Sequence, residues 1–544
     1  MTRVTELAHH LRFTASYLVH ALSTDPAWLV LQASRRLPAR VSAVVVPRVE
    51  RLVGDGTDGE AGRLRAAWAA GAVTTVREAA PRGRTGRRVR AALLGQIGTL
   101  EPVGAADPAG AALTRAGRAG RLAAVHHHLT NSLPHTQSGY TLRTHAILTT
   151  QRAAGRRVTA TTRAGYPLTI GALGARGTDV VDGVEYSRLV PRSLPADHAR
   201  RAEEATALLV AELRRNRPDV VHATTPWTTG EAARAAAAHA GLPWVYEVRG
   251  LPEETWAASH ATVAARDAAT RSERYALVRA KETELALAAD HVVTLSATMR
   301  DELVGRGVPA GRITVVPNAV DSALLGATVP TPPEARARLG LRTAPQVIGT
   351  VSSLVGYEGL DTILRTVATL RDGGTDVSAL VVGDGVARPV LRRLAAELGI
   401  AEHVHLPGRV PRDVARTYLA ALDVVLVPRR PDRVTGLVTP LKPVEAMATG
   451  RPVVASDLPA LREVCSPLDG GAPAALLVAA DDDAAWVDAV GGLLDDGGRR
   501  DALVTAGREV AAERTWSRLV ARYDDVYAAT TGTAVAELHR EDRR

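Results

Sequence analysis

From residue 121 onward, short apolar runs alternate with helical stretches, and this alternation restricts the chain to a small group of folds. A strand followed by a helix and another strand implies a parallel sheet covered by helices. The first series of expected strands covers residues 122–129, 157–162, 220–223, 244–248 and 291–296. The second covers residues 347–351, 377–382, 403–406, 424–427, 453–455 and 475–478. The sequence therefore predicts an α/β fold with two Rossmann-like, doubly wound domains.

Residues 328–333 (Thr-Val-Pro-Thr-Pro-Pro) separate the two series. Prolines lack the N–H that a sheet requires and stiffen the backbone, so this segment is interpreted as an interdomain linker. A length of 544 residues also favours more than one core. The predicted parts are a basic helical accessory segment (1–118), two Rossmann-like domains (119–325 and 326–505) and C-terminal helices that return to the N-terminal domain (506–544).

The positive charge is concentrated in the accessory segment. Residues 1–118 contain 17 Arg and 9 Asp or Glu, a net of +8 out of +9 for the chain. The run from Arg84 to Arg90 lacks interleaved aromatic residues, which argues against nucleic acid and favours a solvated or lipid-facing patch. Cys465 is the only cysteine, and neither a membrane-spanning apolar run nor an apolar signal core is found. These features predict a cytoplasmic protein that binds peripherally to an anionic membrane surface.

The most informative segment is Thr439-Pro-Leu-Lys-Pro-Val-Glu445-Ala-Met-Ala-Thr-Gly450, which joins a loop to a short helix and a strand. A helix N-terminus presents unpaired N–H groups, so the segment from Thr439 to Lys442 is placed to hold a diphosphate. One turn further on, Glu445 is placed to accept hydrogen bonds from a ribose diol. The alternative is an amphipathic helix that ends at Gly450, with Glu445 in an ordinary salt bridge.

This segment resembles the C-terminal signature of the retaining glycosyltransferases of family 4, also called group 1, which have the GT-B fold. The second glutamate of that signature matches Glu445, whereas the first falls on Leu437. The sequence Pro440-Leu441-Lys442-Pro443 is similar to a subgroup in which lysine supplies charge at the phosphates. The resemblance implies two Rossmann-like domains facing a cleft, an N-terminal acceptor domain (119–325) and a C-terminal nucleotide-sugar donor domain (326–505), here with an N-terminal helical extension.

Other segments that resemble motifs of this family occur between residues 121 and 530, in the same order as in the family. Ser138-Gly139 opens a helix after the first strand and resembles a glycine-rich anion loop. Where many members have a histidine beside the reacting sugar, this chain has Arg249, which can bind or orient an anion but cannot act as a general base. A loop that ordinarily offers Arg and Lys to the diphosphate here offers Ser353 and Glu358. The missing charge is expected from the next loop: Arg429, Arg430, Arg433 and Lys442.

The resemblance implies a retaining, metal-independent transfer from a UDP- or GDP-sugar to a cell-envelope glycan, a lipid or a small molecule. No cofactor is expected, because the nucleotide sugar is a substrate. The expected catalytic residues are Lys442, Glu445 and Arg249. The expected donor-binding residues are Gly139, Ser353, Gly383, Arg409, Val410, Thr439, Leu441, Lys442 and Glu445. A nucleotide-sugar epimerase of the same fold and a noncatalytic nucleotide-sugar-binding protein are the alternatives.

Two clusters of His or Asp residues resemble metal-binding motifs, but their positions in the chain do not suit metal coordination. His126, His127 and His128 end an expected strand, where consecutive side chains point to opposite faces. The triplet from Asp481 to Asp483 precedes a helical stretch and is better explained as its N-cap. The sequence therefore predicts that neither cluster binds a metal ion.

Overall fold

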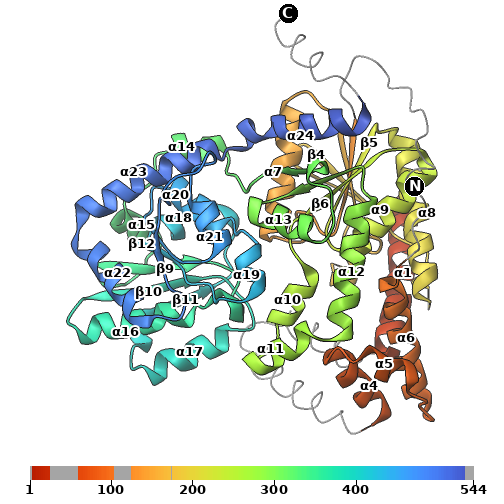
Figure 1. Cartoon of the computed structure of the whole chain (residues 1–544), viewed down its shortest axis with the longest axis horizontal. Coiled ribbons are helices and arrows are strands. Elements are labelled where there is room, and N and C mark those ends of the chain that lie inside the picture. Colours follow the sequence, from red (N-terminus) through yellow and green to blue (C-terminus); the bar gives the residue numbers. More distant parts are fainter. Residues whose placement is uncertain (1–2, 25–58, 103–123, 173, 196, 533–544) are drawn as a thin grey trace, which may run out of the picture. The chain divides into compact units, whose positions relative to one another are not determined.

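The computed structural model describes residues 3–24, 59–102, 124–172, 174–195 and 197–532 (Figure 1). Contacts divide the chain into two units, one of residues 1–293, 307–312 and 524–544 and one of residues 294–306 and 313–523. The chain therefore passes from the first unit to the second between residues 294 and 313, before the segment 328–333 that the sequence analysis interpreted as the linker. Residues 506–523 belong to the second unit, whereas the chain from Asp524 onward belongs to the first.

The first sheet of the described chain has eight strands in the order β3-β4-β2-β1-β5-β6-β7-β8. Strand β1 pairs in parallel with β2 and β5, whereas β3 is antiparallel to β4. The strands are β1 (Val125–Leu129), β2 (Val158–Thr162), β3 (Thr178–Val181), β4 (Val184–Arg188), β5 (Val220–Thr224), β6 (Trp244–Val248), β7 (His291–Thr294) and β8 (Ile313–Val315).

Among the described residues, four helices precede the first strand, and the N-terminal 312 residues contain the following helices. They are α1 (Arg3–Thr24), α4 (Glu60–Ala69), α5 (Val73–Glu78), α6 (Arg84–Leu100), α7 (Gly139–Ala153), α8 (His198–Asn216), α9 (Trp227–Ala240), α10 (Pro252–Ala258), α11 (Val263–Thr270), α12 (Glu273–Ala288) and α13 (Ala297–Gly305). Helices α4, α5 and α6 share a small core around Val76 and Ile97. Phe13 fixes α1 on Leu168 and Val190.

The second sheet of the described chain has six strands in the order β11-β10-β9-β12-β13-β14, and all its pairs are parallel. The strands are β9 (Gln346–Val351), β10 (Val377–Val382), β11 (Val404–Gly408), β12 (Val424–Val427), β13 (Val453–Ser456) and β14 (Leu476–Val478). One sheet that is parallel except for β3 and one that is fully parallel, each wound by helices, confirm the predicted fold class.

Alternating side chains of this sheet form two cores, because neighbouring strand residues point to opposite faces. On β12, Val425 and Val427 face one core, whereas Val424 and Leu426 face the other. The remaining helices are α14 (Ser322–Gly326), α15 (Pro332–Arg338), α16 (Asp361–Asp372), α17 (Arg388–Glu397), α18 (Arg412–Ala420), α19 (Arg433–Leu437), α20 (Lys442–Ala448), α21 (Pro459–Cys465), α22 (Asp483–Asp495), α23 (Gly497–Glu513) and α24 (Trp516–Thr531).

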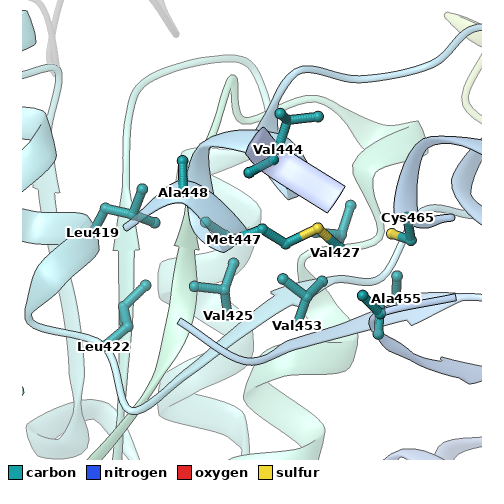
Figure 2. Packing of buried hydrophobic residues seen from close by; sticks show 14 of the residues in the cluster. Leu419, Leu422, Val425, Val427, Val444, Met447, Ala448, Val453, Ala455 and Cys465 are labelled. Carbon is teal, nitrogen blue, oxygen red and sulfur yellow. The ribbon is translucent and has the colours of Figure 1, made fainter. Parts of the chain in front are cut away.

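Helix α20, which contains most of the signature segment, is fixed by its buried face. Val444, Met447 and Ala448 pack against residues of β12 and β13, and Figure 2 shows Met447 lying over these strands. Gly450 follows the helix with a left-handed backbone (φ 64°), a feature that the alternative interpretation of this segment expected. The packing leaves Lys442 and Glu445 only partly buried.

Both sheets reverse their strand order at one position, β1/β5 in the first sheet and β9/β12 in the second. In open parallel sheets, ligands bind beyond the carboxyl ends of the strands at such a position. Helix α7 follows β1, and the loop carrying Arg429 follows β12. The topology therefore places the predicted residues where a ligand site is expected.

Candidate functional site

In the first unit, the loop after β1 leads into the N-terminus of α7. Ser138 caps this helix in a capping box: its hydroxyl accepts from the Thr141 N–H, and its own backbone N–H donates to the Thr141 hydroxyl. A Cβ added at Gly139 would meet no atom within 4 Å, so the protein leaves open space beside the first helical residue. The predicted turn is therefore present, and Gly139 is exposed at the start of the helix.

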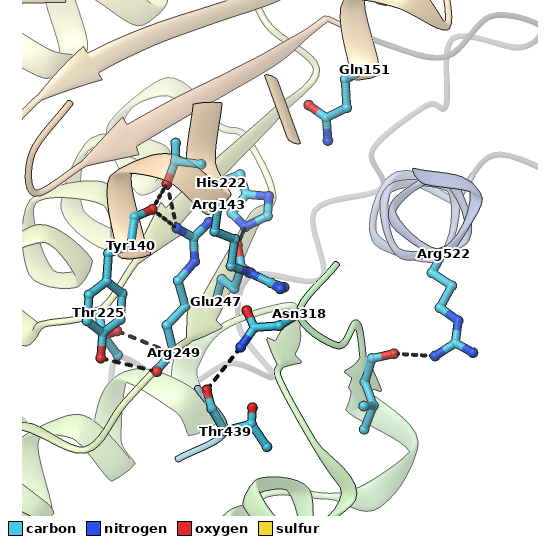
Figure 3. A network of polar contacts seen from close by, with 12 residues as sticks. Tyr140, Arg143, Gln151, His222, Thr225, Glu247, Arg249, Asn318, Thr439 and Arg522 are labelled. Atoms are coloured by element: carbon cyan, nitrogen blue, oxygen red, sulfur yellow. Dashed lines mark hydrogen bonds and ion pairs between the residues drawn. The ribbon is translucent and has the colours of Figure 1, made fainter. Parts of the chain in front are cut away.

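Arg249 follows β6 and is buried, with a guanidinium held by several oxygen atoms. It donates to a Glu247 carboxylate oxygen at 2.6 Å, to the Tyr140 carbonyl oxygen at 3.2 Å and to the Thr144 hydroxyl (Figure 3). The Tyr140 hydroxyl in turn donates to the Arg249 carbonyl oxygen at 3.3 Å. These contacts hold the guanidinium beside the first turn of α7.

Glu247 is a site residue that the sequence analysis did not identify. Its buried carboxylate accepts hydrogen bonds from Arg143 at 2.8 Å and from His222 at 3.1 Å, in addition to the bond from Arg249. Burial alone would raise the pKa of Glu247, but Arg249, Arg143 and His222 hold that pKa well below its usual range. Glu247 and Arg249 are two residues apart on an extended segment, so their side chains share a face. This spacing is the feature of the sequence that could have identified Glu247 as a partner of Arg249.

In the second unit, a buried ion cluster joins the loops after β9 and β12. Glu358 contacts Lys442 Nζ at 2.5 Å and an Arg429 guanidinium nitrogen at 3.5 Å. Burial alone would raise the pKa of Glu358. Lys442 and Arg429 together lower it by more, so the net shift of the pKa is downward. The cluster contains two cations and one carboxylate, which leaves a net charge of +1.

This cluster changes the interpretation of Glu358. The sequence showed an acid where a diphosphate-binding cation was expected, whereas the structure shows that acid holding two of the proposed replacements, Lys442 and Arg429. The other two replacements also have acidic partners, since Arg430 contacts Asp361 at 3.0 Å and Arg433 contacts Glu302 at 2.6 Å.

Glu445 lies half-buried on α20 and is placed differently from its charged neighbours. Its carboxylate accepts no hydrogen bond from the described residues, in contrast to the alternative of an ordinary salt bridge. Burial raises the pKa of Glu445, although Arg412, Arg416 and Lys442 oppose that shift. The carboxylate is therefore available to a ligand near these positive charges.

Thr439 and Leu441 lie immediately before α20. Asn318 donates to the Thr439 carbonyl oxygen at 2.9 Å, whereas the buried Thr439 hydroxyl has no hydrogen-bond partner among the described residues (Figure 3). Leu441 occupies the N-cap position of the helix. This segment thus combines a fixed backbone with an unsatisfied hydroxyl group.

The remaining predicted donor residues lie at the carboxyl ends of neighbouring strands. Ser353 follows β9 and is exposed. Gly383 follows β10 with φ 138°, and a Cβ there would lie 1.8 Å from the Ser352 carbonyl oxygen, so a side chain is excluded. Arg409 is exposed after β11, and Val410 is partly buried against the core.

The side chains of the His126–His128 cluster and of the Asp481–Asp483 cluster make hydrogen bonds within the protein. The rings of His126 and His128 lie within 3.0 Å of the Thr161 hydroxyl, whereas that of His127 lies on the opposite face, 2.9 Å from the Gln151 side-chain oxygen. Asp482 caps α22 by accepting from Ala485 N–H at 2.9 Å, as predicted. Among the described residues, no group of three or more His, Cys, Asp or Glu is arranged to hold a metal ion.

The accessory segment presents an exposed basic face. Arg84, Arg87 and Arg88 are exposed on α6, in agreement with a solvated patch. Arg274 lies over the rings of Trp68 and Trp256, 4.3 and 4.6 Å from their centroids, and so ties α4 to the helices α10 and α12. None of the described helices is long and apolar enough to span a membrane.

Comparison with solved structures shows the fold. Sucrose-phosphate synthase from Thermosynechococcus elongatus aligns with 74% of this chain and 98% of its own, at 21% identity and a TM-score of 0.57. HepE from Anabaena, solved in complex with UDP-glucose, aligns with 74% of this chain and all of its own, at 17% identity and a TM-score of 0.55. The fold is GT-B, as predicted.

Sequence comparison shows the family. The profile described as "Glycosyl transferases group 1" matches residues 345–496, and that described as "Glycosyl transferase 4-like domain" matches residues 138–319. D-inositol 3-phosphate glycosyltransferase from Xylanimonas cellulosilytica is 30% identical over 322 residues, which are 58% of this chain and 72% of that protein. 2-deoxystreptamine glucosyltransferase from Streptomyces kanamyceticus is 33% identical over 202 residues, 37% of this chain and 50% of that protein. The chain belongs to the group 1 glycosyltransferases.

Proposed function

We propose that this glycosyltransferase moves a sugar from a UDP- or GDP-linked donor to an acceptor hydroxyl with retention of configuration and without a divalent metal. The acceptor is a cell-envelope glycan, a lipid or a small molecule. The second unit holds the nucleotide, with the diphosphate near Ser353, Thr439 and Lys442 and the ribose at Glu445. Arg249 in the first unit orients an anionic group of a substrate.

One observation carries this proposal. Glu445 presents a half-buried carboxylate that accepts no hydrogen bond from the described residues, close to a cluster with one positive charge in excess. A ribose diol offers two donors to such a carboxylate, and a diphosphate offers negative charge to the cluster. Other supporting features are the unsatisfied Thr439 hydroxyl and the complex of the structural neighbour HepE with UDP-glucose.

The chemistry that follows is a front-face displacement. The acceptor oxygen forms a bond to C1 of the sugar as the bond from C1 to the diphosphate breaks, and the leaving phosphate oxygen takes the acceptor proton. Negative charge grows on the diphosphate during this step, so the positive excess around Lys442 and Arg429 stabilises the transition state more than the bound donor.

Incubation with labelled UDP- and GDP-sugars and a panel of acceptors, in excess EDTA, tests the proposal. We expect transfer or slow donor hydrolysis, with products that retain the anomeric configuration. Activity that is abolished by chelation and restored by manganese would contradict metal independence. Epimerised free donor, or binding without turnover, would indicate one of the two alternative functions.

We also propose that the enzyme binds an anionic membrane surface through its accessory segment. Besides the basic residues of α6, helix α1 carries exposed apolar side chains at helical spacing: Leu7, Leu11, Leu18, Val19 and Leu22. An amphipathic helix beside basic residues is typical of interfacial binding.

A further inference from the structure

Tyr527, on the C-terminal helix α24, lies far along the chain from Arg249 but is linked to it by hydrogen bonds within the first unit. The Tyr527 side chain is buried, and its hydroxyl lies 2.7 Å from His222 Nδ1 and 2.9 Å from Gln151 Nε2. His222 Nε2 lies 3.1 Å from Glu247, whose same oxygen accepts from Arg249 at 2.6 Å. Three hydrogen bonds therefore connect α24 with the Arg249 guanidinium.

The direction of each hydrogen bond in this relay follows from the groups involved. Glu247 is ionised and can only accept, so His222 must carry its proton on Nε2. Burial lowers the pKa of His222, which keeps the ring neutral and leaves Nδ1 as an acceptor. Tyr527 must therefore donate to Nδ1, and its oxygen accepts the amide N–H of Gln151. One tautomer of His222 satisfies every bond.

The last step of the relay fixes a charged group. The Glu247 oxygen that accepts from His222 also accepts from Arg249, while its other oxygen binds Arg143. Figure 3 shows His222, Arg143 and Arg249 gathered around Glu247. All of these side chains are buried, so a change in the orientation of the carboxylate cannot be compensated by bulk water.

We propose that Tyr527 is a positioning residue, which sets the orientation of Arg249 through His222 and Glu247. Glu247 keeps the His222 proton on Nε2, whereas the hydrogen bond from Tyr527 to Nδ1 fixes the rotation of the ring. Loss of the tyrosine hydroxyl would let the ring turn, so the Nε2–H bond would no longer hold the Glu247 carboxylate, and with it Arg249, in one orientation. This inference rests on the proposed function only in assigning Arg249 to the substrate site.

The chain offers a matched control for Tyr527→Phe. Tyr186 is also buried in the first unit, and its hydroxyl lies 2.7 Å from His145 Nδ1, outside the relay. Both Tyr→Phe substitutions remove one buried Tyr–His hydrogen bond of 2.7 Å, and Y527F in addition removes the bond from Gln151 Nε2. We expect Y527F to lower kcat about tenfold while leaving UDP affinity unchanged, and Y186F to alter neither. Equal kcat for the two variants would overturn the proposal.

Double-mutant cycles test whether Tyr527 acts through Arg249. If it does, kcat of the variant Y527F/R249A should equal that of R249A alone, whereas independent effects would multiply. The same cycle on the midpoint of urea unfolding, with R249M, needs no substrate. We expect nonadditive losses for Y527F with R249M and additive losses for Y186F with R249M. Additive losses for both would overturn the relay, whereas an inactive wild type with nonadditive losses would overturn only the proposed function.

Discussion

Glu358 determines how much positive charge the proposed donor site offers to a ligand. Its carboxylate contacts both Lys442 and Arg429, so the cluster of these three side chains has a net charge of +1. A buried ion pair gains Coulomb energy but loses solvation, and removal of one partner leaves the other uncompensated. The same carboxylate thus stabilises the empty enzyme and competes with a diphosphate for the two cations.

Replacement of Glu358 by Gln should separate these two effects. We expect the free energy of unfolding to fall by about 3 kcal/mol, because the buried Arg429 and the partly buried Lys442 lose their counterion. Affinity for UDP or GDP should rise about tenfold, since the diphosphate then supplies the missing negative charge. Thermal shifts with and without nucleotide measure both quantities. Weaker nucleotide binding by a folded E358Q protein would show that Glu358 mainly orders the site.

The pKa of Glu445 predicts a pH dependence of nucleotide binding. Burial raises this pKa above its ordinary value of 4.5, with Arg412, Arg416 and Lys442 opposing the shift. Only the ionised carboxylate accepts both ribose hydroxyls, so affinity should fall as the pH drops through the raised pKa. Calorimetry between pH 7.5 and 5 should show a steeper loss for the wild type than for Glu445→Gln, which shares the titration of the nucleotide. Parallel curves would remove Glu445 from the site.

Among the elements, the strands were the most predictable from the sequence. All eleven expected strands are present, because a strand buried on both faces is a continuous apolar run such as residues 424–427. The hairpin of β3 and β4 was missed because its strands are partly exposed and not uniformly apolar. Its signal was the Asp182-Gly183 turn, where both residues have positive φ (48° and 74°).

The buried contacts between elements were much less predictable. The sequence indicated Arg249 and Lys442, yet their partners could not be identified without the fold. Lys442 meets Glu358 across 84 residues, and His222 meets Tyr527 across 305. Local patterns specify a helix or strand face, whereas pairing across such separations depends on the packing of whole elements.

Strand β1 should give the protein a measurable sensitivity to acid. Burial lowers the pKa of His126 to about 3 and that of His128 to about 4, so the folded chain binds these protons less readily than the unfolded chain. Stability should therefore decrease as the pH falls below about 6.5, by about 1.4 kcal/mol per pH unit for each histidine, until the folded pKa is reached.

Urea unfolding of the variant His126→Gln measures this contribution. Between pH 6 and 4 the stability of H126Q should fall less steeply than that of the wild type. The difference between the two slopes should be about 1.4 kcal/mol per pH unit. The exposed His239 on α9 provides a control, and H239Q should keep the wild-type slope. An unchanged slope for H126Q would mean that His126 is already protonated in the folded protein.

At the scale of the whole molecule, the proposed tasks fall on different parts of the chain. The second unit carries the proposed nucleotide residues, the first unit carries Arg249 and its relay, and the accessory helices carry the proposed membrane surface. The second unit, the first sheet and the helices α4, α5 and α6 each have a buried core, and α1 packs on the first unit through Phe13. Substitutions of exposed residues in one part should therefore leave the others folded.

The membrane proposal can therefore be tested by surface substitutions. Leu11 and Leu18 on α1 are exposed, and the double variant L11D/L18D should reduce pelleting with anionic liposomes severalfold without lowering Tm. Leu287 on α12 is exposed to the same extent as Leu18, 37%, and provides the control L287D. Equal pelleting of both variants and the wild type would leave α1 without a role at the membrane.

The central claim, a nucleoside diphosphate site around Lys442, is tested most directly by calorimetry of wild type and Lys442→Ala. Titrations of UDP, GDP and their free nucleosides separate the diphosphate from the base and ribose. We predict that K442A weakens binding of the preferred diphosphate by about 1.5 to 3 kcal/mol, the range for a charge-assisted hydrogen bond, and leaves its nucleoside unaffected. Equal losses for diphosphate and nucleoside, or no loss for either, would contradict the account.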